Sequence, residues 1–216
     1  MGDRQRHLRL GVLLSGGGRT LMNLLDAIGA GRLDAEVAVV IASRECKGLD
    51  RAADRGLRTE LVEYRSFAAA GGETDTAAYS EAIVAHLDES GADLVLQAGL
   101  LSFWRIPPRY LGRVMNIHPA LLPSFGGKGM HGRRVHEAVL AAGCKVSGCT
   151  VHFADNEYDA GPIIIQRCVA VGEDDDADAL AARVFEEECI AYPEAVRLFA
   201  AGRLRIENRR VRVLEA

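Results

Sequence analysis

An amide and an imidazole lie two residues apart in the segment Asn116-Ile117-His118-Pro119, directly after an apolar pair. Alternate residues of a strand point to the same face, so Asn116 and His118 are expected to project together from the end of a strand that Pro119 terminates. An amide donor beside an imidazole that can carry a proton suits the stabilisation of a developing oxyanion. Taken alone, the pair has a structural alternative, a strand end with a capping Asn and a satisfied His.

A second group of polar residues follows in Thr150-Val151-His152-Phe153 and in the acidic loop after it, which ends in Asp159-Ala160-Gly161-Pro162. Asp159 is the candidate carboxylate partner of His118. A nearby carboxylate orients an imidazole and raises its pKa. A solvated loop carboxylate is the alternative. Two further histidines, His131 and His136, lie next to Arg133 and Arg134 and are interpreted as part of the polar face of a helix, with an anion contact as the alternative.

A glycine-rich turn, Ser15-Gly16-Gly17-Gly18-Arg19-Thr20, connects an apolar run to a helix pattern. Backbone N–H groups at such a helix N-terminus suit a phosphate, and Arg19 and Thr20 add a cation and a hydroxyl. The turn is not a Walker A motif, because no Gly-Lys-Ser/Thr follows, and Leu21 stands where Gly-x-Gly-x-x-Gly requires its third glycine. A simple tight turn between strand and helix is an equal alternative.

The candidate residues are far apart in the sequence, so the fold must bring the ends of several strands and their loops together. Hydrophobic patterning predicts strands over residues 8–14, 35–42, 60–63, 94–96, 114–117, 146–153 and 163–171, and a terminal strand or hairpin over 204–213. It predicts helices over 21–28, 49–55, 74–90, 131–142 and 177–201. The alternation indicates an α/β fold, a Rossmann-like, mostly parallel twisted sheet flanked by helices. The acidic run 173–176 is interpreted as the start of the last helix.

Composition limits the function classes. The chain has 216 residues with a net charge of −4, which gives no indication of a nucleic-acid surface. Its five cysteines are odd in number and lack metal-ligand spacing, so free thiols in a reducing cytoplasm and no metal site are expected. No secretory signal and no run of about twenty apolar residues is found, so no membrane association is expected. The oligomeric state is expected to be a monomer or a homodimer.

The chain resembles the folate-dependent formyltransferases, and among them the glycinamide ribonucleotide branch. The segments that carry the resemblance are Ser15–Gly18, Ala98-Gly99, Asn116–Pro119, Leu121–Phe125, Gly148–Phe153, Asp159–Ile164, Glu188 and Tyr192-Pro193. They follow the family order over almost the whole chain. The resemblance implies a single formyltransferase domain over residues 1–216, with a phosphate- and substrate-binding half (1–100) and a folate-binding and catalytic half (101–216).

The resemblance also implies an activity. A formyl group passes from 10-formyltetrahydrofolate, a co-substrate, to the amine of phosphoribosylglycinamide in de novo purine synthesis, with no metal. Asn116, His118 and Asp159 are the implied catalytic residues. The implied substrate-binding residues are Gly16, Gly17, Gly18, Arg19, Thr20 and Glu188. The implied folate-binding residues are Leu101, Ser102, Phe103, Trp104, Asn116, Asp155, Asn156, Glu157, Tyr158 and Asp159, largely through their backbone. Thr150 stands where the family has a small hydroxyl residue that supports the site.

The sequence departs from the family pattern in three places. The glycine-rich turn ends in Arg19-Thr20 instead of Ser-Asn or Thr-Asn, Ser102 stands where Arg or Lys is frequent, and Thr76 replaces a basic residue that often contacts folate. These departures leave open a formyltransferase for a different phosphorylated amine, or a formyltetrahydrofolate hydrolase. A catalytically silent folate- or nucleotide-binding protein is a further alternative, against which the presence of Asn116, His118 and Asp159 together argues.

Overall fold

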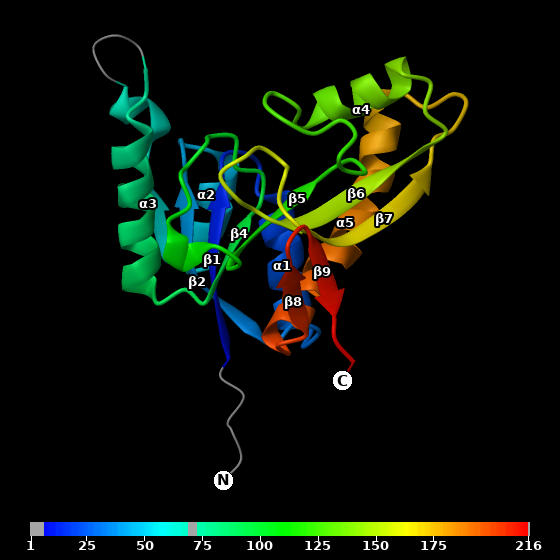
Figure 1. Ribbon diagram of the computed structural model, residues 1–216. Coiled ribbons are helices and arrows are strands. Elements are labelled where there is room, and N and C mark those ends of the chain that lie inside the picture. The colour runs from blue at the N-terminus through cyan, green and yellow to red at the C-terminus, as the bar shows by residue number, and fades with distance from the viewer. Residues whose placement is uncertain (1–6, 69–72, 216) are drawn as a thin grey trace. The chain divides into compact units, whose positions relative to one another are not determined.

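The computed structural model describes residues 7–68 and 73–215 of a chain that divides into two units, Met1–Arg105 and Ile106–Ala216 (Figure 1). In the first unit a sheet has the strand order β3-β2-β1-β4. Its strands are β1 (Leu8–Leu14), β2 (Ala35–Ala42), β3 (Thr59–Leu61) and β4 (Leu94–Gln97). All neighbouring strands of this sheet are parallel, as the alternation of strands and helices predicts.

Three α-helices connect these strands, and a short 3-10 helix, η1 (Tyr64–Phe67), follows β3. They are α1 (Arg19–Gly29), α2 (Lys47–Asp54) and α3 (Thr76–Ser90). The chain crosses from β1 to β3 in one direction and returns to β4 in the other, so right-handed crossovers place α1 and α2 on one face and α3 on the opposite face. The carboxyl ends of β1, β2 and β4 therefore lie side by side at one edge, where open α/β sheets bind ligands.

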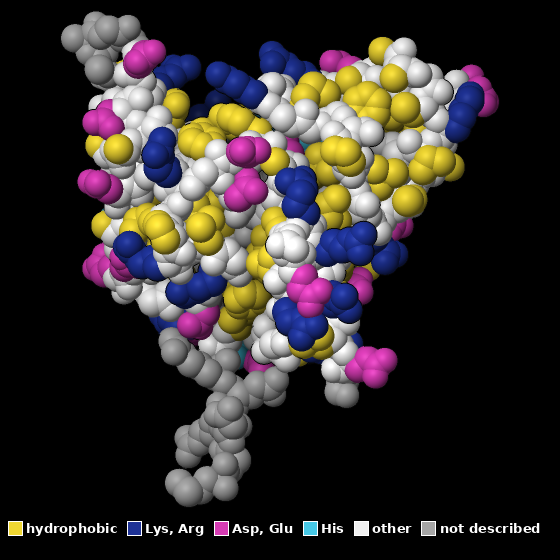
Figure 2. All heavy atoms as spheres, in the orientation of Figure 1, with side chains coloured by type: hydrophobic (Ala, Val, Ile, Leu, Met, Phe, Trp, Pro, Cys, Tyr) yellow, Lys and Arg dark blue, Asp and Glu magenta, His cyan; other side chains and the backbone are white. Residues whose placement is uncertain are grey.

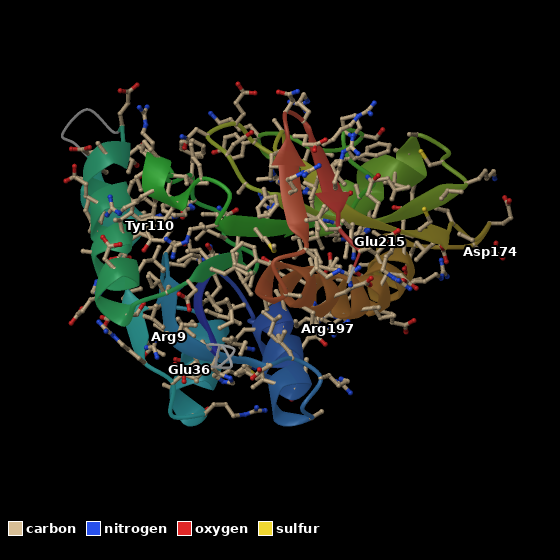
Figure 3. All side chains as sticks on the ribbon, turned by 60° about the horizontal axis from the view of Figure 1, so that its bottom comes forward. Arg9, Glu36, Tyr110, Asp174, Arg197 and Glu215 are labelled. Carbon is tan, nitrogen blue, oxygen red and sulfur yellow. The ribbon has the colours of Figure 1, made fainter. Side chains whose placement is uncertain are left out.

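The opposite end of β1 is held by Arg9. Its side chain points toward Glu36 of β2 and forms an ion pair with it (Figure 3). The same guanidinium donates through Nε and one terminal nitrogen to the carbonyl of Ser90, the last residue of α3, at 3.2 and 2.9 Å. A cation at the C-terminal end of a helix satisfies its last carbonyls and opposes its dipole. Arg9 thus ties α3 to the sheet.

The second unit has the strand order β5-β6-β7-β9-β8. Its elements are η2 (Pro108–Tyr110), β5 (Val114–His118), α4 (Arg133–Ala141), β6 (Val146–Phe153), β7 (Ile163–Ala170), α5 (Ala177–Ala200), β8 (Leu204–Glu207) and β9 (Arg210–Val213). α5 packs against β6 and β7, and α4 packs against α5. Basic and acidic side chains gather over the β8–β9 hairpin, where Glu207 pairs with Arg205 and Arg212 (Figure 2).

Strand direction in the second unit departs from the mostly parallel pattern. β5–β6, β6–β7 and β8–β9 are antiparallel, and β7–β9 is parallel. The connection between β6 and β7 is a loop without a helix, and a parallel pair would need a crossover connection of a dozen or more residues. The acidic run does begin the last helix, because the Asp176 carboxylate accepts hydrogen bonds from the backbone N–H groups of Asp178 and Ala179.

His136 of α4 corrects another expectation. Its side chain is buried, with 4% of the residue exposed, so only His131 of the two helix-region histidines is on the surface. The reason is helical periodicity, because Val135, His136 and Val139 form the inward face of α4. Its Nδ1 has no hydrogen-bond partner among the described residues. Burial, reinforced by the nearby His118, lowers the pKa of His136.

This burial predicts an acid-sensitive stability. Because the folded-state pKa of His136 lies below the ordinary value of 6.5, the unfolded chain binds the proton more readily. The free energy of unfolding should therefore decrease as the pH is lowered from 7 to 5. His136→Leu should reduce this decrease, whereas His131→Leu at the exposed neighbouring histidine should not. Urea denaturation at several pH values measures both, and equal pH dependence of the two variants would contradict the assignment.

No helix among the described residues is long and apolar enough to cross a membrane.

Candidate active site

β5 brings Asn116 and His118 to one carboxylate. The Asn116 side-chain nitrogen donates to Asp159 Oδ1 at 3.3 Å, and His118 Nδ1 lies 3.6 Å from Asp159 Oδ2. The two β5 residues are separated by one position, so they share a face of the strand as the spacing predicts. His118 is only 3% exposed. The three residues that were singled out as catalytic candidates therefore form one cluster in the second unit.

The conformation of Asp159 is fixed by its surroundings. Asp159 has a φ of 52°, in the left-handed region, and its Oδ2 accepts a hydrogen bond from the backbone N–H of Gly127 at 2.9 Å. A Cβ on the preceding Gly126 would lie 3.2 Å from the Asp159 Cβ and 2.5 Å from a Leu122 methyl group. The glycines of segment 126–129 therefore allow the chain to pass closely around the carboxylate.

His152 of β6 completes the cluster and had no assigned role in the sequence. The antiparallel register places it directly opposite Asn116. Its Nδ1 donates to the Phe153 carbonyl at 2.9 Å, which leaves Nε2 to accept from the Asn116 amide at 3.1 Å. Both amide hydrogens of Asn116 are thus directed at His152 and Asp159. One of them must turn toward a substrate oxygen for Asn116 to stabilise an oxyanion.

The protonation states of the cluster follow from burial and charge. Burial lowers the pKa of His118, and it outweighs the attraction of Asp159 and the hydrogen bond from Nε2 to the Phe125 carbonyl (2.8 Å), which both raise it. The pKa of His118 is therefore lowered, whereas the sequence predicted that the nearby carboxylate would raise it. Burial alone would raise the pKa of Asp159, but its interactions with His152, His118 and Gly127 together lower it. At neutral pH the cluster therefore holds a neutral imidazole against a carboxylate.

Thr150 supports the loop that follows β5. Its hydroxyl donates to the Ala120 carbonyl at 2.7 Å and accepts from the Leu122 N–H at 3.0 Å. The Gln166 side-chain nitrogen bridges the same hydroxyl and the Leu122 carbonyl, at 3.0 and 2.9 Å. These four hydrogen bonds tie β6 and β7 to the segment between His118 and Gly126.

Removing this hydroxyl should weaken both the fold and the site. Thr150→Val keeps the shape of the side chain but leaves buried polar groups unpaired, which costs about 1–3 kcal/mol of unfolding free energy. We expect it to lower turnover about tenfold, and Thr150→Ser to retain both properties. Chemical denaturation and steady-state kinetics on the two variants provide the comparison. A Val variant as stable and active as the Ser variant would rule out this supporting role.

The glycine-rich loop of the first unit has the form of an anion site. The carbonyls of Ser15, Gly16 and Gly17 accept hydrogen bonds from Arg44 Nε (2.6 Å), Gly48 N (2.9 Å) and an Arg51 terminal nitrogen (2.7 Å). All three donors belong to the segment that ends β2 and begins α2. In a trans peptide the following N–H points away from the carbonyl, so the N–H groups of residues 16–18 face the opposite side. N–H groups that face one side in this way are typical of anion-binding nests.

Gly18 closes this loop. It has a φ of 72°, and a Cβ there would lie 2.7 Å from the Cα of Gly48. Gly18 is also the N-cap of α1, which has no side-chain cap and no acidic residue in its first turn. α1 begins at Arg19, two residues before the predicted start, so Arg19 and Thr20 lie in the first helical turn. The helix end and the nest therefore favour the same kind of ligand, a phosphate.

Comparison with known proteins agrees with this geometry. Residues 8–196 match the family model described as formyl transferase. The chain belongs to the formyl transferase family. It is 30% identical to the phosphoribosylglycinamide formyltransferase of Haemophilus influenzae, over 93% of this chain and 91% of that protein. It is 36% identical to the bovine trifunctional purine biosynthetic protein adenosine-3 over 94% of this chain, but spans only 19% of that protein's length.

Solved structures extend the similarity to the fold. Glycinamide ribonucleotide transformylase 1 from Symbiobacterium toebii has a TM-score of 0.86 and 39% identity, covering 100% of this chain and 99% of its own. A formyltetrahydrofolate deformylase from Pseudomonas syringae has a TM-score of 0.81 but 22% identity, over 98% of this chain and 67% of its own. The latter shows the fold alone. The α/β prediction is confirmed.

The remaining folate-binding candidates of this formyl transferase use their side chains in different ways. Asn156 forms a pair of hydrogen bonds with the backbone of Ile106, at 2.8 and 3.1 Å, and Asp155 accepts from the Glu157 N–H at 2.9 Å. These side chains stabilise the loop itself, so a ligand there would meet mainly its backbone. Tyr158 is 44% exposed.

The side chains of the loop after β4 also differ in exposure and in their contacts. Trp104 is 2% exposed, so its indole is part of the protein interior and does not offer an open face to a ligand. Ser102 is half-buried and its hydroxyl contacts Tyr79 of α3 at 2.6 Å, whereas Leu101 is exposed. Leu101 N donates to the Ser15 hydroxyl at 2.8 Å, which joins this loop to the start of the glycine-rich loop.

Glu188 lies on α5 beside buried groups of the second unit. Burial raises the pKa of Cys149 to about 12, and the Glu188 charge adds to the effect. Burial and Glu188 likewise raise the pKa of Tyr192, whose hydroxyl donates to the Met115 carbonyl at 2.9 Å. The Glu188 charge therefore acts on a buried residue of β6, the strand that carries His152, and on Tyr192 of α5. Among the described residues, no group of three or more His, Cys, Asp or Glu side chains is arranged to hold a metal.

Proposed function

We propose that this chain transfers the formyl group of 10-formyltetrahydrofolate to the amine of phosphoribosylglycinamide, a step of de novo purine biosynthesis. The observation that carries the proposal is the convergence of Asn116 and His118 on the Asp159 carboxylate. The names of relatives that match over nearly their whole length support the same reaction.

In this mechanism the substrate amine attacks the formyl carbon. A carbon–nitrogen bond forms to the amine, the bond to the folate nitrogen breaks, the amine loses a proton and the folate nitrogen gains one. Asn116 and His118 donate to the oxygen that becomes negative. His118 is neutral in the free protein, so it first takes up the proton that the amine loses, which Asp159 routes through water. Asp159 stabilises the imidazolium that forms, and His118 then gives the proton to the leaving nitrogen. The chain forms no covalent intermediate and acts by positioning and electrostatics.

Each half of the single domain has its own part in this proposal. The first half binds the substrate phosphate at Gly16–Thr20, where the N–H groups of the nest meet the N-terminus of α1. The second half holds the folate through the backbone of residues 155–159 and carries the catalytic cluster, and Glu188 contacts the ribose. The segment 101–104 contributes backbone contacts to the folate. The protein is proposed to work in the cytoplasm as a monomer or homodimer.

Arg19 motivates one alternative substrate. A guanidinium-bearing residue in the first turn of α1, where the family has Ser or Thr, adds a positive charge next to the phosphate nest. The alternative is therefore a different phosphorylated amine.

A three-way assay separates these possibilities. Purified protein with 10-formyltetrahydrofolate is given phosphoribosylglycinamide, its dephosphorylated form, or no amine, and tetrahydrofolate release is followed. Turnover that requires the phosphorylated amine supports the proposal. Equal turnover without amine would identify a hydrolase, and no turnover with intact folate binding would direct the search to other amines.

A further inference from the structure

Four hydroxyl groups form a chain at the ligand-binding edge of the first unit. Ser15 follows β1, Ser43 follows β2 and Ser102 belongs to the loop after β4, while Tyr79 comes from α3. The Ser15 and Ser43 oxygens are 2.6 Å apart, and the Tyr79 and Ser102 oxygens are also 2.6 Å apart. The Ser43 side chain is also within hydrogen-bonding reach of the Tyr79 hydroxyl. This row of four hydroxyl groups is therefore tied at both ends to the loop after β4: Leu101 N donates to Ser15 at one end, and Ser102 is the hydroxyl at the other end.

The donors and acceptors of this chain have a consistent direction. The Leu101 N–H can only donate, so the Ser15 oxygen accepts it and can direct its own hydrogen to Ser43. Ser43 can then donate to Tyr79, and Tyr79 to Ser102. In this arrangement each hydroxyl accepts once, and the Ser102 hydrogen is left for one further acceptor. Buried hydrogen-bond networks that are fully satisfied make a structure rigid.

Burial keeps this row of hydrogen-bonded hydroxyl groups intact at physiological pH. Tyr79 is fully buried, and Ser15 and Ser43 are 1% and 6% exposed. Burial raises the pKa of Tyr79 to about 12, so its hydroxyl keeps the hydrogen that it donates. The Tyr79 ring is itself held by edge contacts with Tyr64 and Phe67, at centroid distances of 4.9 and 5.6 Å.

We propose that Ser15, Ser43, Tyr79 and Ser102 form a positioning network that fixes the loop of residues 99–104 against the start of the glycine-rich loop. This inference rests on the proposed function, in which the first loop meets the formyl donor and the second meets the substrate phosphate. Ser102, where the family often has a cation, acts here through Tyr79. Both loops are thereby held in one rigid arrangement before either ligand binds.

Tyr79→Phe tests the network because it removes one hydroxyl and keeps the ring. Tyr64→Phe is the matched control, since Tyr64 belongs to the same aromatic cluster but its hydroxyl is not part of the four-hydroxyl network. In the ligand-free protein, hydrogen–deuterium exchange of peptides covering residues 98–105 and 14–20 should become about fivefold to tenfold faster in Tyr79→Phe. It should stay within about twofold of the parent in Tyr64→Phe. Unchanged exchange in Tyr79→Phe would overturn the proposal.

Kinetics provide the second arm. Tyr79→Phe should raise KM for 10-formyltetrahydrofolate about fivefold to tenfold with kcat within about threefold, because the reacting groups are untouched. Ser102→Ala should have a similar effect alone and almost none in the Tyr79→Phe background, since both changes remove the same hydrogen bond. Additive effects would overturn the proposal. If the parent protein transfers no formyl group, the proposed function fails, while the exchange experiment still decides whether the network exists.

Discussion

His118→Ala is expected to lower kcat of formyl transfer by about a hundredfold or more while leaving folate binding nearly intact. Removal of a general acid that also stabilises an oxyanion has an effect of about this size. Binding persists because the folate is proposed to be held mainly by the backbone of residues 155–159, and the Asn156 and Asp155 side chains that stabilise this loop bond to Ile106 and Glu157 and not to His118.

Steady-state kinetics and equilibrium titration with a folate analogue measure the two quantities separately. His131→Ala serves as the control, since His131 is an exposed histidine that precedes α4. A His118 variant with turnover within tenfold of the parent would remove His118 from the mechanism, whereas loss of folate binding would assign it a binding role.

Asp159→Asn is expected to lower kcat by about a hundredfold to a thousandfold with only a small change in size at the site. The substitution removes the charge that stabilises the His118 imidazolium. Of the influences that raise the pKa of His118, the Asp159 charge is the largest, so this pKa should decrease further in the variant. Histidine proton resonances followed by NMR during a pH titration measure that change directly.

Asp155→Asn is the matched control in the same loop. Asp155 accepts a hydrogen bond from the Glu157 N–H, and the amide oxygen of Asn can accept the same bond. We therefore expect the control to keep near-parental turnover and the same His118 titration. An unaltered His118 pKa in Asp159→Asn would show that the carboxylate does not act through the imidazole.

Much of this fold could be predicted because its elements obey local rules. The strands Leu8–Leu14, Ala35–Ala42 and Val146–Phe153 have the predicted bounds, because turn and loop residues flank each of them. The shared face of Asn116 and His118 followed from strand periodicity alone. Helix starts were less predictable, because Gly18 caps α1 through its backbone conformation instead of a side chain.

The contacts that complete the site could not be read from the sequence, because they depend on register and burial. Only the antiparallel pairing of β5 and β6 places His152 opposite Asn116. Alternation along a strand does place Thr150 and His152 on one face, and this was the sequence feature that could have indicated a role for His152 in the site. The pKa of His118 depends on how deeply the imidazole is buried, and burial outweighs the carboxylate that the sequence pointed to. The hydrogen bonds between the Asn156 side chain and the Ile106 backbone likewise join residues that are far apart in the sequence.

The most direct test of the account follows the formyl carbon itself. 10-Formyltetrahydrofolate carrying a carbon-13 label in the formyl group is incubated with the protein and phosphoribosylglycinamide, and the products are identified by mass spectrometry. We predict that the label appears in the amide of formylated phosphoribosylglycinamide, one equivalent for each tetrahydrofolate released. Asp159→Asn should slow the labelling about a hundredfold or more, while Asp155→Asn should preserve its rate. Label recovered as formate, at a rate independent of the amine, would contradict formyl transfer by this site.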